Sequence, residues 1–87
     1  MRVIRKYTLE TSNLIQNITM PLDAKVKRFD FQSGQFCIWV LTDPQQKTEV
    51  QFYFLLIETD EYFVEGEYID SCQDGMDTWH LIQKHPA

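Results

Sequence analysis

Four side chains in the sequence could ligate a transition metal or form a nucleophile–base pair. They are the cysteines and histidines of the chain, Cys37, Cys72, His80 and His85. A zinc site draws such ligands from two closely spaced pairs, and the two cysteines, which are 35 positions apart, form no such pair. A cysteine nucleophile needs a stabilised thiolate, an adjacent base and an oxyanion hole. Cys37 lies in an apolar run that disfavours the thiolate, and nothing in the sequence completes a site around Cys72 and His80.

The last third of the chain contains a faint likeness to a calcium-binding loop. Asp70, Asp74, Gly75 and Asp77 supply three carboxylates and a glycine. The alternating ligand order and the closing glutamate of such a loop are missing. The sequence also has no glycine-rich phosphate-binding loop. We therefore predict no metal, no cofactor and no enzymatic activity.

Charge is the more informative property of this sequence. Residues 1–28 carry a net charge of +4 and residues 29–87 carry −9, which together give −5. The segment 58–77 contains eight acids and no base. Such a segment can be a solvated rim that protects strand edges, or a surface complementary to a basic partner protein. Both interpretations stay open at the level of sequence.

Two candidate binding surfaces follow from this distribution. The first is acidic, has aromatic anchors in Tyr62 and Phe63, and suits a protein partner. It comprises Glu58, Glu61, Tyr62, Phe63, Glu65 and Glu67. The second is basic with one aromatic side chain and suits a nucleotide-like anion. It comprises Arg2, Arg5, Lys27, Arg28 and Trp39.

The elements that must position these residues are predicted to be strands. Alternating apolar residues mark seven segments, and no window of the sequence has the 3.6-residue apolar period of a helix. The predicted strands span residues 2–9, 14–20, 25–32, 35–41, 50–57, 68–72 and 78–83, with a further short strand at 62–64. We predict a single all-β domain over residues 1–87, a small sandwich or partly open barrel of about seven short, mainly antiparallel strands.

Two of these strands are apolar on both faces. Residues 35–41 and 50–57 are predicted to form a hairpin across the Pro44 turn, which creates four apolar faces to cover. Either the sheet curls so that the remaining strands cover them, or one face is a subunit interface. We carry a homo-oligomer as a prediction.

Composition limits the cell compartments and the classes of partner that suit this protein. The 87 residues are 44% hydrophobic and 24% charged, which excludes a disordered chain. The excess of acids disfavours direct nucleic-acid binding. The charged start of the chain is unlike a signal peptide, and the longest apolar run has six residues where a membrane span needs roughly 20. We expect a cytoplasmic protein with reduced cysteines and no membrane association.

Motifs spread over most of the chain resemble a known group of proteins. The opening M-R-V-I-R-K-Y-T-L, the I-T-M-P of residues 18–21 and the W-H of Trp79 and His80 are landmarks of that group. The most specific motif is Q-S-G-Q-F-C-I-W-V-L-T-D-P at residues 32–44. Together they resemble a family of short uncharacterised proteins encoded by tailed bacteriophages and prophages. Asp70 and Ser71 depart from it, because that family tends to have Gly-Thr at these positions.

The resemblance implies a phage origin and a small β fold, and it implies no catalytic residue. Small acidic phage proteins often act as accessory factors on a host protein. We therefore expect a non-catalytic interaction protein, an inhibitor of a host defence or nucleic-acid-handling protein that uses the acidic surface. The alternative is a small-ligand binder that sequesters a nucleotide-like anion at the basic surface. In either case the protein would act in the host cytoplasm.

Overall fold

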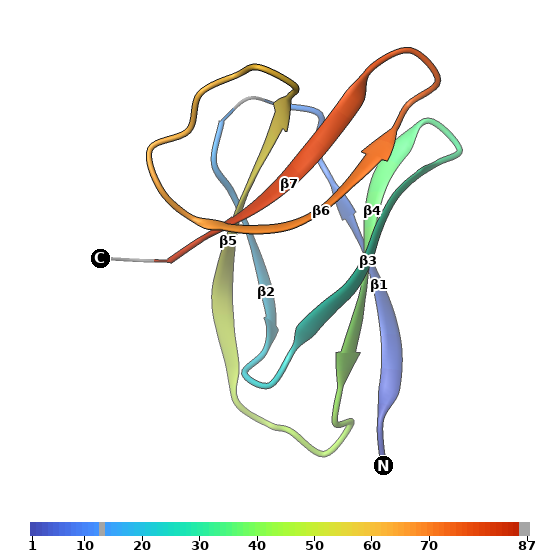
Figure 1. Ribbon diagram of the computed structural model, residues 1–87. Helices are drawn as coiled ribbons and strands as arrows, with labels where there is room; N and C mark the ends of the chain where they lie inside the picture. The colour runs from blue at the N-terminus through green and yellow to red at the C-terminus, as the bar shows by residue number, and fades with distance from the viewer. Residues whose placement is uncertain (13, 86–87) are drawn as a thin grey trace.

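The computed structural model describes residues 1–12 and 14–85 (Figure 1). Within these residues the secondary structure consists of strands and turns, and there is no helix that could span a membrane. The strands are β1 (Val3–Leu9), β2 (Gln16–Pro21), β3 (Lys25–Gln32), β4 (Gln35–Thr42), β5 (Glu49–Glu58), β6 (Glu67–Gln73) and β7 (Thr78–Lys84). The predicted all-β sandwich is confirmed.

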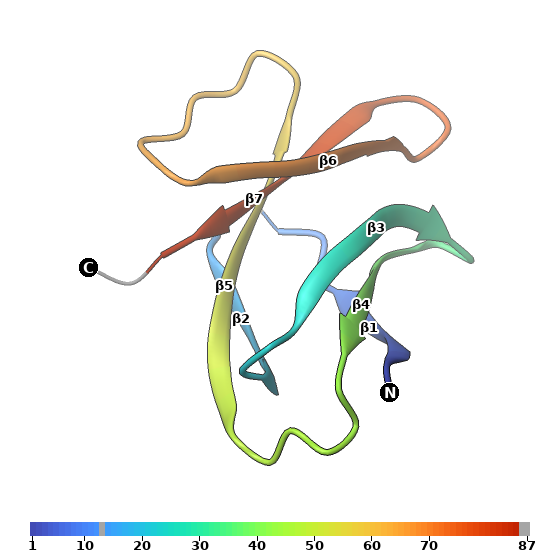
Figure 2. The ribbon, with the colours of Figure 1, turned by 60° about the horizontal axis from the view of Figure 1, so that its bottom comes forward.

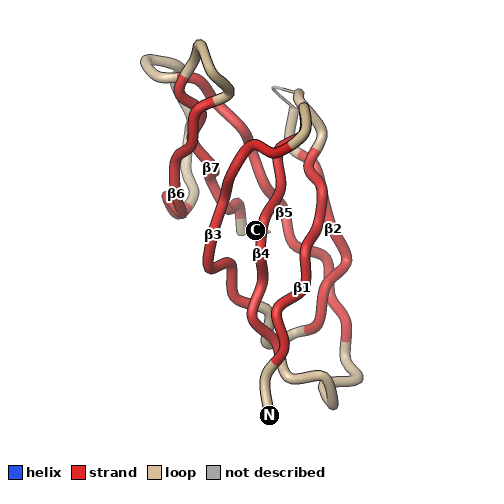
Figure 3. The backbone as a smooth tube through the Cα atoms, turned by 90° about the vertical axis from the view of Figure 1, so that its right-hand side faces the viewer, coloured by secondary structure: helices blue, strands red, loops and turns tan. Residues whose placement is uncertain are grey.

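Two sheets form the sandwich. One has three strands in the order β1–β4–β3, and the other has four in the order β2–β5–β7–β6. Every pairing is antiparallel. Figure 3 shows β1, β4 and β3 side by side, with β2 and β5 behind them. Figure 2 shows that β6 and β7 extend beyond β3 at the top of the molecule.

The predicted hairpin between residues 35–41 and 50–57 is wrong. β4 and β5 belong to different sheets, so the 43–48 segment crosses from one sheet to the other. The turn itself is present, since the Gln46 amide donates to the Asp43 carbonyl at 3.0 Å. Turn residues report only that the chain reverses, and they do not specify whether the two strands then pair.

The hairpin between β3 and β4 follows its turn chemistry. Ser33 and Gly34 have φ angles of 51° and 79°, and they connect paired strands. Positive φ at both central residues is the geometry of a type I′ turn, whose twist matches that of the strands it joins.

The predicted short strand at residues 62–64 is also wrong. These residues lie in the loop between β5 and β6 and pair with no strand of the described chain. Asp60 and Gly66 have φ angles of 76° and 141°, which bend the chain on either side of the segment. Strand-forming side chains are not sufficient where the backbone has no ladder to join.

The core lies between the sheets and covers the inner faces of both two-faced strands. Phe36 and Val40 of β4 and Phe54 and Leu56 of β5 are 1% exposed or less. Their neighbours in the same cluster are Leu9, Met20, Phe29, Ile38 and Leu81. The Phe29 ring stacks on Phe36 with 5.7 Å between the ring centroids, and the Trp79 ring is tilted against Phe36 at 5.4 Å. The inner apolar faces therefore cover each other within one chain.

Candidate functional site

Residues 59–66 join β5 to β6 in the loop that projects at the upper left of Figure 1. We call this segment the β5–β6 loop. Tyr62 is 99% exposed and Val64 is 97% exposed, whereas Phe63 between them is 40% exposed. An apolar side chain that stays almost wholly in water contributes no hydrophobic free energy to folding. The loop thus presents Tyr62 and Val64 outward.

Hydrogen bonds at its first turn hold the loop. The Glu58 amide donates to Glu61 Oε1 at 2.7 Å, and the Glu61 amide donates to the Glu58 carbonyl at 3.2 Å. The carboxylate of Glu61 is therefore occupied within the loop. Of the predicted acidic set, Glu61 serves the loop's own structure, while Glu65 in the same loop and Glu67 at the start of β6 are exposed.

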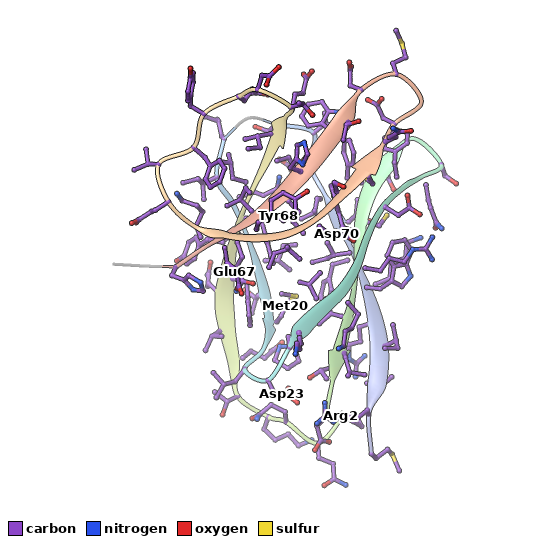
Figure 4. The ribbon with its side chains drawn as sticks, in the orientation of Figure 1. Arg2, Met20, Asp23, Glu67, Tyr68 and Asp70 are labelled. Atoms are coloured by element: carbon purple, nitrogen blue, oxygen red, sulfur yellow. The ribbon has the colours of Figure 1, made fainter. Side chains whose placement is uncertain are left out.

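A histidine that the sequence did not assign to this surface connects the loop to the sheet. His80 Nε2 lies 2.9 Å from Thr59 Oγ1, and His80 Nδ1 lies 2.9 Å from the Tyr68 hydroxyl. A neutral imidazole donates from one nitrogen and accepts at the other, and hydroxyl groups can take either role. Figure 4 labels Tyr68 on β6, which pairs with β7, the strand that carries His80. His80 thus ties the start of the loop to the start of β6.

Packing fixes the far end of the loop. Phe63 lines a hollow together with Ile57, Tyr68 and His80. Gly66 lies so close to β7 that an added Cβ would be 2.5 Å from Ile82 Cγ2. The Lys84 ammonium also donates to the Glu65 carbonyl. The close approach of Gly66 to β7 and the hydrogen bond from Lys84 therefore hold the far end of the loop, and Tyr62 and Val64 remain exposed.

The structure gathers further acids beside the loop. Partial loss of hydration raises the pKa of Glu58, and the carboxylates of Asp77, Glu61 and Asp74 raise it further. Asp74 and Asp77 belong to the β6–β7 turn, so the acids at the two ends of the 58–77 segment lie near each other. Met76 in the same turn is 94% exposed.

Asp74 organises that turn. Its carboxylate accepts the amides of Asp77 at 2.8 Å and Met76 at 3.0 Å, and the Trp79 indole N–H at 3.1 Å. These donors lower the pKa of Asp74. The calcium-like spacing noted in the sequence is thus explained by a turn whose carboxylate binds its own backbone. No group of three or more potential ligand side chains could hold a metal ion within residues 1–12 and 14–85.

The basic candidate set is only partly assembled. Arg28 lies over the Trp39 ring at 4.9 Å from its centroid, and it pairs with Asp30 at 2.6 Å. Lys6, which the sequence did not include in the set, lies over the same ring at 5.5 Å. Lys6 and Arg28 both oppose Trp39 across their strand pairings, which explains the arrangement.

The other bases of that set lie elsewhere. Arg5 opposes Val40 and faces the other side of the sheet from Arg28. Arg2 acts electrostatically on Asp23, and Figure 4 places both at the lower end of the molecule. Lys27 occupies the bulge of β3 between Val26 and Arg28. The five residues therefore do not form one pocket.

The cysteine and histidine pair considered from the sequence is separated by the sheet. Cys72 opposes Trp79 and packs against the core, whereas the neighbouring His80 contacts the loop on the other face. Burial raises the pKa of the Cys72 thiol to about 11, with Asp30, Asp70 and Asp74 adding to the shift. That thiol is a poor nucleophile.

A family model described as a domain of unknown function (DUF7352) matches residues 1–87. The chain belongs to this family. No curated protein and no solved structure matches the chain. The match covers the whole chain and shows that it is an uncharacterised domain family to which the chain belongs. The DUF7352 chain thus combines a preorganised acidic loop with a separate, basic sheet face.

Proposed function

We propose that this DUF7352 protein is a non-catalytic interaction protein that binds a basic partner protein through its β5–β6 loop. One observation carries the proposal. Tyr62 and Val64 are almost fully exposed on a loop that is hydrogen-bonded and packed at both ends. Apolar side chains exposed in this way typically mark a contact surface.

Preorganisation makes such a loop an effective binding element. Burying one large apolar side chain contributes about 1.5–3 kcal/mol. Ordering a flexible segment on binding would offset that gain. The contacts of Glu61, Gly66 and His80 hold the loop before any partner arrives. The free energy gained by burying Tyr62 and Val64 against a partner is then not offset by a cost of ordering the loop.

Charge defines the chemistry of the partner. Asp60, Glu65 and Glu67 surround the exposed apolar residues, and Asp74 and Asp77 lie near the base of the loop. A partner with Lys and Arg around an apolar pocket is complementary to this surface. Association with such a partner should weaken as salt rises, because exposed charges are screened.

The resemblance to phage proteins supports a more specific proposal about the partner. A protein that handles nucleic acid in a bacterial host carries a basic surface, and an acidic loop could occupy it. We therefore propose a phage-encoded inhibitor of a host defence or nucleic-acid-handling protein, acting in the host cytoplasm. The acidic end of the molecule is the feature that supports this choice.

The test is capture of a partner from bacterial lysate, followed by measurement with the purified partner. We expect Tyr62→Ser with Val64→Ser to abolish binding, and Glu65→Lys with Glu67→Lys to weaken it more than tenfold at low salt. Glu61 is left unchanged because its carboxylate holds the loop. Leu22→Ser is the control, since Leu22 is also an exposed apolar residue, at 54%, but lies in the β2–β3 turn. Equal binding by all variants would refute the proposal.

A nucleotide-like ligand is the second candidate, and the Trp39 ring beside Lys6 and Arg28 is the observation in its favour. Both cations lie over the ring and Arg28 is paired with Asp30, so a base would have to displace them. If this candidate is correct, nucleotides should raise the melting temperature of the protein and Arg28→Glu should abolish the effect. If the loop is the binding site, nucleotides should leave the melting temperature unchanged.

A further inference from the structure

The two sheets have four edge strands, and three of them carry features that interrupt pairing with another strand. β2 ends in Pro21, which has no amide hydrogen to donate. β3 and β6 each contain a bulge, and they lie against each other, with the Phe29 amide donating to Asp70 Oδ2 at 3.3 Å. Bulges, prolines and coverage are the usual means of protecting a sheet edge.

β1 is the exception. It pairs with β4 without a register shift from Val3 to Leu9, and no other strand of the described residues packs extensively along it. Its opposite edge is therefore a regular row of backbone donors and acceptors that a further strand could join. Figure 1 places β1 at the lower right, away from the β5–β6 loop.

The side chains of β1 disfavour pairing with a second copy of itself. Arg5 and Lys6 lie near the middle of the strand and are exposed. Two β1 strands paired antiparallel about their centres would place Lys6 opposite Lys6. Like charges directly opposite across a strand pair are destabilising. The same cations favour a strand that carries acids.

Both faces beside β1 offer a place for acidic side chains. On the inward side lies an open hollow of about 340 Å³ lined by Arg5, Tyr7, Pro21, Gln46, Lys47 and Glu49. Arg5 and Lys47 outnumber the single acid there. On the outward side Lys6 lies over Trp39, and it forms none of the ion pairs of the described residues. An added strand would direct alternate side chains to these two sites.

We propose that the free edge of β1 binds an acidic, extended segment of a partner protein as a fourth strand of the β1–β4–β3 sheet. Backbone hydrogen bonds to β1 supply the pairing, and Arg5 and Lys6 select acidic side chains. This surface is separate from the β5–β6 loop, so the proposal does not depend on the function proposed for that loop.

The test uses a capped peptide of alternating glutamate and valine, as long as β1, followed by amide NMR of the full chain. We expect chemical-shift changes concentrated in β1 and slower hydrogen exchange of its amides. Arg5→Glu should weaken binding about fivefold or more. Lys27→Glu makes the same change in net charge on β3 and should leave the affinity within about twofold. The spectra of both variants also serve as the check that each is folded.

Two further peptides and one measurement separate strand addition from other outcomes. The same peptide N-methylated at every backbone amide keeps its charge but cannot pair, so we expect no binding. A lysine–valine peptide should also fail to bind. Equal binding of the methylated peptide, or absence of shifts in β1, would overturn the proposal. Protection of β1 that rises with protein concentration in the absence of peptide would replace the acidic partner by a second copy and would overturn it as well.

Discussion

At the scale of single residues, Thr42 and Asp23 form the most constrained polar contact. Thr42 is fully buried at the end of β4, and its hydroxyl donates to Asp23 Oδ1 at 2.5 Å. The Asp43 amide donates to Asp23 Oδ2 at 2.8 Å. These bonds tie the β2–β3 turn to the end of β4. The hydrogen bonds from Thr42 and Asp43 lower the pKa of Asp23 below its ordinary 3.8.

The first prediction concerns this contact. Thr42→Val removes the donor without changing the shape of the side chain, and we expect the free energy of unfolding to fall by about 1 kcal/mol near neutral pH. Since the pKa of Asp23 is lowered by folding, the stability that it contributes is present above pH 3.8 and is lost as the pH falls through the folded value. The deficit of the variant should therefore shrink in acid.

Urea denaturation of both proteins over a pH series measures this difference. Thr19→Val is the matched control, because Thr19 is exposed on β2 and should give no such pH-dependent deficit. A deficit for Thr42→Val that is constant down to the most acidic point would contradict the role assigned to Asp23.

At the scale of elements, the β5–β6 loop depends on its close approach to β7. Gly66 has a φ of 141°, and an alanine Cβ there would lie 2.5 Å from Ile82 Cγ2 and 3.0 Å from the Gln83 carbonyl. Ile82 is fully buried and Gln83 contributes backbone, so neither can move freely. The loop therefore has to shift if a side chain is added.

We predict that Gly66→Ala destabilises the protein and loosens the loop. Gly75 is the internal control, since it also has a positive φ of 104° but nothing within 4 Å of an added Cβ. Gly66→Ala should cost about 1–3 kcal/mol more than Gly75→Ala in denaturant unfolding, because only Gly66 adds a clash to the backbone strain. Hydrogen exchange of the loop should increase only in Gly66→Ala. Equal effects of the two substitutions would contradict this account of the loop.

The elements also show which predictions from sequence succeed. Alternation of apolar residues located the seven main strands, with boundaries shifted by a residue or two, since alternation reflects the two faces of each strand. It also marked Tyr62 to Val64 as a strand, which was wrong because the signal cannot show whether a ladder partner exists. The candidate acids could be located by composition, but Val64 and His80 joined the site only through loop geometry.

At the scale of the whole molecule, the homo-oligomer stays a prediction, and two of the four apolar faces considered from the sequence are excluded as its interface. The inner faces of β4 and β5 cover each other, so they are not available to a second subunit. Tyr53 and Leu55 are half-buried on the outer face of β5, and Ile15, which is 55% exposed, lines a hollow with Tyr53. This outer face is an apolar surface available to another copy.

Light scattering checks this prediction. We expect a mass that is a multiple of the 10.4 kDa of one chain, and Leu55→Glu should convert the protein to a monomer. Thr8→Glu adds the same charge at an exposed position of the other sheet and should leave the mass unchanged. A mass of 10.4 kDa for the unaltered protein would contradict the prediction outright.

The sequence by itself determined the all-β class, the strands and the separation of a basic first third from an acidic remainder. These properties depend on residues that are close along the chain, where the period of two and the net charge of a segment can be read directly. Only the tertiary structure decided which strands pair, and hence that β4 and β5 lie in different sheets. It also decided that Arg5 and Arg28 point to opposite faces and that the edge of β1 is the regular one. Pairing and exposure depend on contacts between residues distant in sequence, and local patterns do not encode them.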